Sequence, residues 1–544
     1  MTVTYQELVK NFSWDKVLDY YDWDPRKKFN PAHECCDRWA TDPTRVAIYW
    51  EDELGNKETW TFAKLKEKSD RMANWLRSLG VEEGDRVAGL LPKDMELIVT
   101  VLATWKVGAL YVPLFTAFGP GALEHRINDC DCKILVTNKE QAQKINPDNT
   151  SVELIIIEEQ FNGQTFWEYL DTFSSEHKTA EKKLDAPFAI QYTSGSTGLP
   201  KGAVWSPKIF INLYPYQKYA IGVEEGDLLF GGADLGWSFG LINCTYGPLM
   251  YGATILLYKG KFEVEKYYQL MQDYKVTNFA FAPTAYRAMM AAGPELVKKY
   301  NISVKKFSSA GEPLNAEVVR FFQNNFGRAI YDHYGATEMG MPLNNYNITD
   351  MEVKPGSMGF PSPGITIALL DPEGDPVRPG EIGEIAFDRT TFPFFFLGYW
   401  KDPEKTEQKM LGRWMLSGDL ASVDENGYYW FEGRSDDVIS SAGYRIGPFE
   451  VESSLIEHEA VQEVAVVGKP DEAKGEIVKA YVVLKDAYKN QASDTLAEEL
   501  SLFVKNRLSK HQYPREIEFI DELPKTQSGK IQRFVLRKRM QESK

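Results

Sequence analysis

The sequence predicts an α/β protein with a large N-terminal domain and a separate, smaller α+β domain at the C-terminus. Strand-like and helix-like stretches alternate through about the first 350 residues, which is the rhythm of βαβ units. Over residues 355–432 the pattern changes to short strands with frequent turns, and after Gly433 it becomes mixed again. We therefore expect a parallel sheet covered by helices, in a chain of 544 residues that is long enough for roughly three or four domain-sized units.

The elements of the first part follow one another at short intervals. Apolar residues recur at helical spacing over 94–107, and short apolar runs rich in β-branched residues indicate strands on either side. The expected strands are 86–91, 109–113, 133–137 and 152–157, and the expected helices are 94–107 and 121–128; a mostly apolar run follows at 188–192.

Turn residues dominate the next part of the chain. Asp371-Pro-Glu-Gly374 and Asp424-Glu-Asn-Gly427 have the composition of β-turns, so we expect a small β-rich subdomain there. The last hundred residues contain enough elements for an α+β domain of their own. Its expected helices are 449–457 and 495–508, and its expected strands are 461–468 and 477–484.

Composition excludes several classes of protein. The formal net charge of −16 argues against a nucleic-acid-binding surface, which requires a basic face, although a local basic patch can still hold a phosphorylated cofactor. The N-terminus has no apolar h-region, and no apolar run reaches the length of a transmembrane helix. We expect a soluble, cytoplasmic protein without a transmembrane segment.

The five cysteines do not form a disulfide framework. Cys130-Asp131-Cys132 resembles a metal or redox pair, but no second pair or nearby histidine completes a zinc site. We interpret the cysteines as buried or tolerated thiols.

The segment from Tyr192 to Gly202, Tyr-Thr-Ser-Gly-Ser-Thr-Gly-Leu-Pro-Lys-Gly, has the composition of a phosphate-binding loop. Its glycines allow the backbone to approach an anion, its hydroxyls can donate hydrogen bonds to phosphate oxygens, and its lysine adds a positive charge. It is not the P-loop of nucleoside triphosphatases, because Gly202 stands where that loop needs a Ser or Thr. The candidate nucleotide-binding residues here are Thr193, Ser194, Gly195, Ser196, Thr197, Gly198 and Lys201.

Further segments follow this loop in a fixed order. They are Ser309-Ala-Gly-Glu-Pro313, Tyr334-Gly-Ala-Thr-Glu338, Ser417-Gly-Asp419, Gly433-Arg-Ser-Asp-Asp437, Gly443-Tyr-Arg-Ile-Gly447 and Pro524-Lys-Thr-Gln-Ser-Gly-Lys530. Together they resemble the adenylate-forming superfamily of acyl-CoA synthetases, luciferases and nonribosomal peptide adenylation domains. The resemblance spans nearly the whole chain and is greatest to AMP-forming acetyl-CoA and medium-chain acyl-CoA synthetases.

The resemblance implies an N-terminal AMP-binding domain over 1–435 and a mobile C-terminal domain over 436–544, with a hinge at Asp436. The large domain would hold two βαβ-type subdomains and a small β-barrel-like subdomain at about 355–432. The implied reaction has two steps. A carboxylate attacks the α-phosphate of ATP and gives an acyl-adenylate and pyrophosphate, and coenzyme A then displaces AMP.

The resemblance also implies roles for the residues of these segments. Lys530 would stabilise the charge that develops during adenylation, Glu338 would hold Mg²⁺, Thr337 would donate to the α-phosphate, and Arg445 would contact phosphate. A turn lysine and a helix-starting Thr-Glu pair are the structural alternatives. The other implied nucleotide-binding residues are Gly311, Glu312, Pro313, Asp332, His333, Tyr334 and Gly335 around the base, and Asp419 and Arg434 at the ribose.

Two further implied sites belong to the C-terminal domain. Ala442 and Gly443 would let the pantetheine of coenzyme A pass close to the backbone. His458 matches a position near magnesium in acetyl-CoA synthetases, but a helix-end histidine satisfied by a carbonyl explains it equally well.

The acid-binding pocket is implied by Trp237, Ser238, Phe239 and Gly335. Acetate-specific enzymes carry a tryptophan at the position of Gly335, so its absence predicts room for a longer acid. Three extra buried methylenes would favour that acid by about 2.4 kcal/mol, or roughly fifty-fold. Phe239 acts in the opposite direction, because a phenyl ring shortens or bends the pocket. The prediction is a short- or medium-chain or branched acid rather than acetate, with aromatic acids as an alternative.

Other functions remain open from the sequence alone. The chain can be an aryl-CoA ligase, an adenylation enzyme that loads a separate carrier protein, or a catalytically silent nucleotide- or acyl-binding protein. The combined presence of Lys201, Glu338 and Lys530 favours an enzyme over a silent binder. The expected small-molecule partners are a carboxylic acid, ATP with Mg²⁺ and coenzyme A, and a homo-oligomer is left open.

Overall fold

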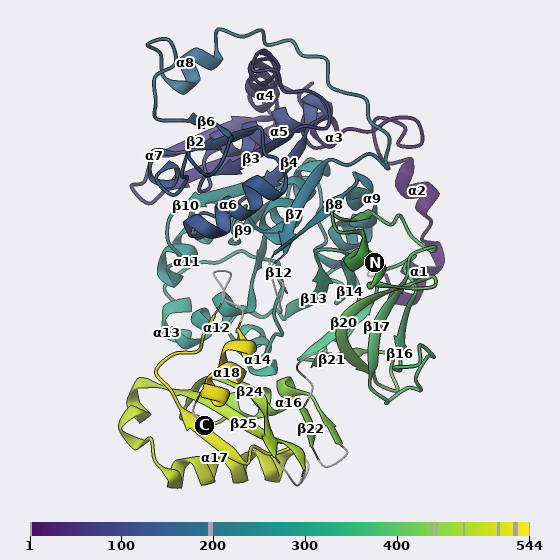
Figure 1. Cartoon of the computed structure of the whole chain (residues 1–544), viewed down its shortest axis with the longest axis vertical. Helices are drawn as coiled ribbons and strands as arrows, with labels where there is room; N and C mark the ends of the chain where they lie inside the picture. Colours follow the sequence, from purple (N-terminus) through teal and green to yellow (C-terminus); the bar gives the residue numbers. More distant parts are fainter. Residues whose placement is uncertain are drawn as a thin grey trace.

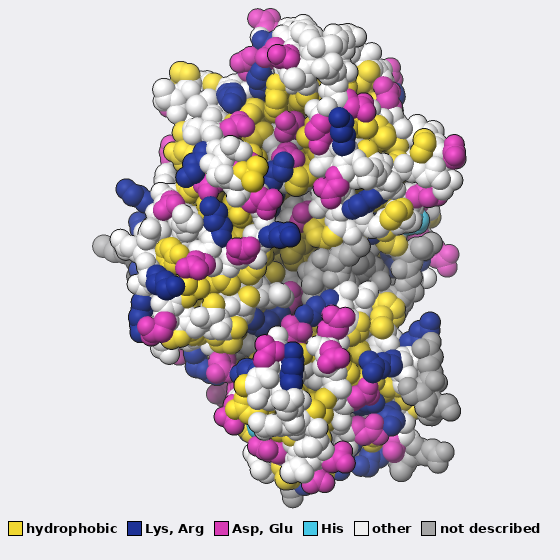
Figure 2. Space-filling model, turned by 90° about the vertical axis from the view of Figure 1, so that its left-hand side faces the viewer, with side chains coloured by type: hydrophobic (Ala, Val, Ile, Leu, Met, Phe, Trp, Pro, Cys, Tyr) yellow, Lys and Arg dark blue, Asp and Glu magenta, His cyan; other side chains and the backbone are white. Residues whose placement is uncertain are grey.

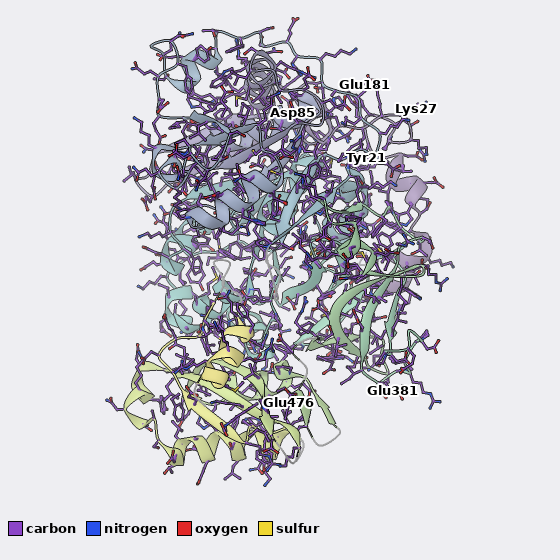
Figure 3. The ribbon with its side chains drawn as sticks, viewed as in Figure 1. Tyr21, Lys27, Asp85, Glu181, Glu381 and Glu476 are labelled. Atoms are coloured by element: carbon purple, nitrogen blue, oxygen red, sulfur yellow. The ribbon has the colours of Figure 1, made fainter. Side chains whose placement is uncertain are left out.

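The computed structural model describes residues 3–193, 200–435, 437, 439–441, 444–471, 474–508, 512–525 and 531–542. It confirms the α/β fold, with a large N-terminal part above and a small C-terminal domain below in Figure 1. On the face drawn in Figure 2, basic and acidic side chains are interspersed over both parts. Figure 3 places Asp85 in the upper part, Glu381 at the lower edge of the β-rich region and Glu476 in the small domain.

The largest sheet has fourteen strands and runs through most of the large part. Its central strands, from β1 to β13, are parallel, which confirms the predicted βαβ arrangement. In spatial order the strands are β16 (Ile367–Leu370), β17 (Gly383–Asp388), β20 (Trp414–Val423), β21 (Tyr429–Arg434), β15 (Ser357–Pro361), β14 (Gly340–Asn344), β13 (Ile330–Ala336), β12 (Lys306–Ala310), β11 (Asn278–Phe281), β9 (Leu228–Gly231), β10 (Thr254–Lys259), β1 (Val46–Asp52) and β2 (Lys57–Thr61), and β19 (Met410–Leu411) pairs with β20.

The predicted β-rich subdomain is an antiparallel extension of this same sheet. The strand β14 pairs with β15 through Leu343 and Pro361, and β15 pairs with β21. Among the described residues the order ends at β16 without returning to close a barrel. The subdomain is therefore joined to the parallel sheet by continuous hydrogen bonding.

A second sheet of seven strands contains the first strands predicted from the sequence. Its order is β18 (Phe396–Tyr399), β8 (Lys201–Trp205), β7 (Ala189–Thr193), β4 (Leu110–Pro113), β3 (Arg86–Leu90), β5 (Ile134–Thr137) and β6 (Glu153–Ile156). The strand β18 follows the β-rich region in sequence but pairs with β8, where Tyr399 lies opposite Ala203. This crossing brings Tyr399 to the edge of the predicted phosphate loop.

Helices cover and separate the two sheets (Figure 1). The helix α5 is buried along almost its whole length, and Tyr246 donates a hydrogen bond from its hydroxyl to the carbonyl of Ile98 within it at 3.0 Å. The helices of the large part are α1 (Tyr5–Asn11), α2 (Trp14–Leu18), α3 (Pro31–Cys35), η1 (Asp37–Trp39), α4 (Phe62–Ser78), α5 (Met95–Val107), α6 (Pro120–Asp129), α7 (Lys139–Ala142), α8 (Phe166–Leu170), α9 (Lys208–Asn212), η2 (Tyr216–Ala220), η3 (Phe239–Tyr246), α10 (Gly247–Met250), α11 (Val264–Asp273), α12 (Pro283–Ala291), α13 (Pro294–Val297), α14 (Ala316–Phe326) and α15 (Pro403–Glu407).

The small domain has hydrophobic clusters of its own, built from residues after 438. Its helix α16 packs against β21 of the large part. Arg320 of α14 and Glu457, directly after α16, form an ion pair between the large part and the small domain at 3.7 Å. The elements of the small domain are β22 (Ile439–Ser441), β23 (Tyr444–Ile446), α16 (Pro448–Ile456), β24 (Val461–Asp471), β25 (Gly475–Leu484), η4 (Asp486–Gln491), α17 (Asp494–Arg507), β26 (Glu516–Phe519) and α18 (Arg533–Glu542). A domain boundary at residue 436 remains a prediction.

All five cysteines are buried free thiols, as predicted, and burial raises the pKa of Cys244 to about 12. Within the described ranges, no helix is long and apolar enough to cross a membrane.

Candidate active site

The candidate site lies where two parallel strands, β12 and β13, end beside each other. Gly311 to Pro313 follow β12 directly, and Tyr334 to Ala336 form the last residues of β13. Ligands of open α/β sheets bind at the carboxyl ends of the strands, because side chains and backbone groups of several loops meet there. Thr337 and Glu338 follow at this edge, in the turn that leads into β14.

Glu338 and Lys201 are brought together by Tyr399, which the sequence did not indicate. The Tyr399 hydroxyl donates to Glu338 Oε1 at 2.6 Å, and Lys201 Nζ lies 5.2 Å from the centre of the Tyr399 ring. Burial and the neighbouring Glu338 carboxylate raise the pKa of Tyr399, so it remains a hydrogen-bond donor. Tyr399 therefore contacts both the Glu338 carboxylate and the Lys201 ammonium group, close to the end of the predicted loop.

The surroundings of Lys201 favour an anion. Partial burial lowers its pKa, and the nearby cations Lys405 and Lys409 lower it further. A phosphate group bound here would oppose both effects, because negative charge stabilises the protonated amine. Lys409 also donates to the carbonyl of Ser417 at 3.0 Å, which connects this cluster to the predicted ribose site.

The predicted ribose pair is assembled by the register of two strands. Asp419 of β20 lies opposite Arg434 of β21, and their side chains form an ion pair at 3.4 Å. The Tyr334 hydroxyl donates to Asp419 Oδ2 at 2.6 Å, and burial raises the pKa of that tyrosine well above its usual value. The end of β13 and the β20–β21 pair thus form one wall of the candidate site.

The strands β7 and β8 flank the glycine-rich loop in sequence. Thr193 and Lys201 are register partners in the β7–β8 pair, and the Thr193 hydroxyl donates weakly to the Lys201 carbonyl at 3.4 Å. Of the predicted loop residues, Ser194, Gly195, Ser196, Thr197 and Gly198 lie outside the described residues.

The segment after β12 is held by neighbours from the large part. Gly311 has a φ of 98°, and a Cβ there would lie 2.7 Å from Cη2 of Trp237, so the indole packs against a position that only glycine fits. The Glu312 carboxylate pairs with Arg287 at 2.6 Å and accepts from the hydroxyl of Thr284 at 2.8 Å. Pro313, which follows it, is half-buried.

Two of the predicted nucleotide-binding residues point into the protein. Asp332 accepts a hydrogen bond from the Ser309 hydroxyl, and burial raises its pKa to about 7. The buried His333 ring packs edge-on against Tyr216 at 5.1 Å between centroids, and its pKa falls to about 3, so it is neutral. These side chains support β13 from within the core.

A cavity of about 70 Å³ opens beside the end of β13, and the four residues predicted for the acid pocket all line it. They are Trp237, Ser238, Phe239 and Gly335. Thr337 lines it as well, and the Trp205 indole donates to the carbonyl of Thr337 at 2.9 Å. Gly311 and Thr337, which were predicted for the nucleotide site, also line the cavity. The lining residues that were not predicted from the sequence are Trp205, Ile209, Leu213, Ile242, Asn243, Ala310, Ala336, Gly340 and Met341. The helical apolar runs that carry several of them are the only signal that could have found them.

The expectation that Gly335 leaves open room was wrong. A Cβ at this position would lie 2.2 Å from the carbonyl oxygen of Gly340 and 2.5 Å from Sδ of Met341. The direction in which a side chain would leave Gly335 is therefore occupied by the turn into β14. Chain length must be set by other walls of the cavity.

The predicted residues of the small domain are described only in part. Four of them lie outside the described residues: Lys530, Asp436, Ala442 and Gly443. For Arg445, only the backbone is described; it lies in β23, opposite Ser440 of β22.

His458 has partners within the small domain. Its Nε2 lies 3.3 Å from Glu499 Oε1, its Nδ1 accepts from the Ala460 amide at 3.3 Å, and its ring packs edge-on against Phe503. These contacts favour the structural interpretation of this histidine.

The donor set suits a magnesium ion that is shared with a nucleotide. Among the described residues, no group of three or more acidic, histidine or cysteine side chains converges to hold a metal alone. Mg²⁺ bound to nucleotides typically uses one or two carboxylates and takes its other ligands from phosphate and water. Glu338, a carboxylate beside Lys201, fits that arrangement.

An α/β sheet edge with a lysine–carboxylate site beside an apolar cavity defines a nucleotide-using enzyme. The model of AMP-binding enzymes matches residues 36–400, and that of the AMP-binding enzyme C-terminal domain matches residues 450–530. The chain belongs to the AMP-binding enzyme family, and it is an AMP-forming acyl-CoA synthetase of the adenylate-forming superfamily.

Similar proteins support this family assignment over nearly the full length of the chain. The acetyl-coenzyme A synthetase of Bacillus subtilis is 39% identical over 98% of this chain and 94% of its own. The crystal structure of a Brucella canis acyl-CoA synthetase matches with a TM-score of 0.77 and 40% identity over 99% of both chains. A benzoate CoA ligase from Burkholderia xenovorans matches with a TM-score of 0.82 and 32% identity, over 94% of this chain and 100% of that one.

Proposed function

We propose that the enzyme activates a short- or medium-chain, branched or aromatic carboxylic acid rather than acetate. The observation that carries the proposal is the position of Thr337, which lines the apolar cavity while the adjacent Glu338 lies in the lysine–carboxylate site. A carboxylate at the cavity mouth would therefore lie next to a bound α-phosphate. The cavity walls include Trp205, Trp237 and Phe239, whose apolar surface suits a hydrocarbon tail or a ring.

In the first half-reaction, a carboxylate oxygen of the acid would attack the α-phosphorus, and pyrophosphate would leave. Glu338 would hold Mg²⁺, which supplies charge neutralisation to the phosphate oxygens when bound. Lys201 would bind the leaving phosphates, and Asp419 would accept hydrogen bonds from the ribose hydroxyls. Lys530 is the residue predicted from sequence to stabilise charge near the α-phosphate.

In the second half-reaction, the thiol sulfur of coenzyme A would attack the acyl carbonyl carbon, and AMP would leave with the electron pair of the cleaved C–O bond. The thiol proton would be released to solvent or to a base. Ala442 and Gly443 are the predicted neighbours of the pantetheine, and rotation about Asp436 would bring them to the site.

The test is the rate of AMP release with ATP, Mg²⁺ and coenzyme A across acids. The panel runs from acetate to octanoate and adds isobutyrate, 2-methylbutyrate and benzoate. An optimum at butyrate or longer, or at a branched or aromatic acid, is the expected outcome. Acetate as the best substrate would contradict the proposed acid class, which the similarity to an acetyl-coenzyme A synthetase makes a real alternative.

The same assay distinguishes the carrier-loading alternative. A synthetase that uses free coenzyme A consumes one thiol for each AMP released. An acyl-adenylate that accumulates while coenzyme A remains unused would favour a carrier protein as the thiol donor. A cytoplasmic location stays a prediction from the sequence.

A further inference from the structure

One amide side chain stands in the apolar cavity. Asn243 lies on η3, lines the cavity, and is only 7% exposed. Its Oδ1 is buried and has no hydrogen-bond partner within the part of the chain that the structure describes. Buried polar groups in folded proteins are nearly always paired, so an orphaned amide oxygen at a cavity wall indicates a missing ligand group or water.

The backbone around this residue is firmly held. The Gln217 side-chain amide donates to the Asn243 carbonyl at 3.0 Å, and η3 is a π-helix, a form that is frequent at functional sites. The neighbours of Asn243 on the cavity wall include the apolar Ile242 and Phe239. A leucine of similar size would complete that wall without an unpaired polar atom, so the amide has no packing advantage there.

The other polar groups of the cavity lie elsewhere. Thr337 adjoins the lysine–carboxylate site, and both Thr337 and Ser238 are more exposed than Asn243. None of the described residues that line the cavity carries a charge. A ligand group that reaches Asn243 is therefore neutral, because burying an unpaired charge in such a wall is strongly unfavourable.

We propose that the acid activated by this enzyme carries a hydroxyl group on its tail, remote from the carboxyl, and that Asn243 accepts the hydrogen bond from that hydroxyl. The inference rests on the proposed function, since it narrows the class of acid within the same cavity. Asn243 is thus a specificity-determining residue. An aliphatic hydroxy acid and a phenolic acid present the same donor, and the test separates the two.

The test uses pairs of acids in which a methyl group replaces the hydroxyl at equal size. The pairs are 4-hydroxybutyrate with pentanoate, and 4-hydroxybenzoate with 4-methylbenzoate, with acetate as a reference. The kcat/KM of coenzyme A-dependent AMP release is measured for each. We expect the hydroxyl member of one pair to be favoured by at least about tenfold, because its methyl analogue leaves the amide unpaired.

The variant Asn243→Leu should lose or reverse this preference, since the apolar wall then accepts the methyl member. Asn243→Ala gives the same comparison should the leucine variant fail to fold. The matched control is Ile242→Leu, which changes the shape of the same wall without changing its polarity and should keep the preference.

Three outcomes are decisive. A wild-type preference for the methyl member of both pairs would overturn the inference. So would an equal loss for both members in Asn243→Leu, which would show a purely structural amide. AMP release with acetate alone would instead overturn the proposed acid class on which the inference rests.

Discussion

At the scale of single residues, Glu338 shows how the site combines a predicted residue with an unexpected one. Its sequence neighbourhood predicted a magnesium ligand, whereas the hydrogen bond from Tyr399 that orients it joins residues 61 positions apart. Oriented carboxylates hold a metal in a productive geometry, and loss of such a supporting contact typically reduces affinity or activity.

We expect Glu338→Gln to reduce acyl-adenylate formation by roughly a hundredfold or more, because a neutral amide neither attracts Mg²⁺ nor balances Lys201. The measurement is ATP–pyrophosphate exchange in the presence of the preferred acid, as a function of Mg²⁺ concentration. The half-saturating Mg²⁺ concentration should rise with the loss of rate.

The comparison variant is Tyr399→Phe, which removes only the orienting hydrogen bond and keeps the carboxylate. The exchange rate of Tyr399→Phe should fall less than that of Glu338→Gln. The order of acid preference should stay unchanged. A Glu338→Gln variant with normal exchange and normal magnesium dependence would contradict the assigned role.

At the scale of elements, the pair β13–β14 shows why a glycine is needed at the site. The register of this pair shifts between Tyr334 and Ala336, and the intervening Gly335 lies against the carbonyl of Gly340. Any side chain at this position would have to displace the backbone of β14 as well as the flexible side chain of Met341.

We therefore expect Gly335→Ala to destabilise the protein by about 1–3 kcal/mol through overpacking. The midpoint of thermal unfolding and the urea midpoint should both fall. The matched control is Gly121→Ala in α6, where no atom lies within 4 Å of the added carbon and alanine favours the helix. Equal stability of the two variants would contradict the interpretation that the turn at Gly335 is too crowded for a side chain.

Elements differ in how well the sequence predicts them. The predicted helix at 94–107 and strand at 86–91 agree with α5 and β3 to within a residue, because their periodicity is a local property. The strand β18 was missed, because it is four residues long and is defined by its pairing with β8, almost 200 residues away.

At the scale of the whole molecule, a cavity of about 300 Å³ lies between the large part and α16 of the small domain. Glu432 of the large part and Glu450 of α16 both line it. Burial, and secondarily the Glu432 carboxylate, raise the pKa of Glu450 to about 7, and burial raises the pKa of Glu432. We therefore expect contact between the two parts to depend on pH.

The direction of the pH effect on docking follows from how tightly Glu450 holds its proton. Because the Glu432 carboxylate of the large part contributes to the raised pKa of Glu450, we expect the docked arrangement to hold that proton more tightly, so that docking is favoured at low pH and weakens as pH rises towards about 7. Glu450→Gln should remove this dependence and stabilise docking above pH 7, with little effect below pH 5.

Energy transfer between dyes on Leu54→Cys and Leu502→Cys measures this docking, because both positions are exposed and all five native cysteines are buried. A pH-independent signal in the parent protein, or the same pH dependence in Glu450→Gln, would contradict the assignment. Glu373→Gln, on an exposed turn far from α16 in sequence, is the control variant.

The sequence by itself determined the α/β class, most of the local helices and strands and the two-part organisation, and it supplied the candidate nucleotide-binding residues, which stay a prediction. These follow from side-chain periodicity and from short segments such as Tyr334 to Glu338, whose chemistry is local. The tertiary structure alone decided that Tyr399 orients Glu338, that Gly335 is crowded, and that Asn243 faces an apolar cavity. Those three facts depend on contacts between elements that are remote in the chain or on the packing of one turn, and no pattern of neighbouring residues records them.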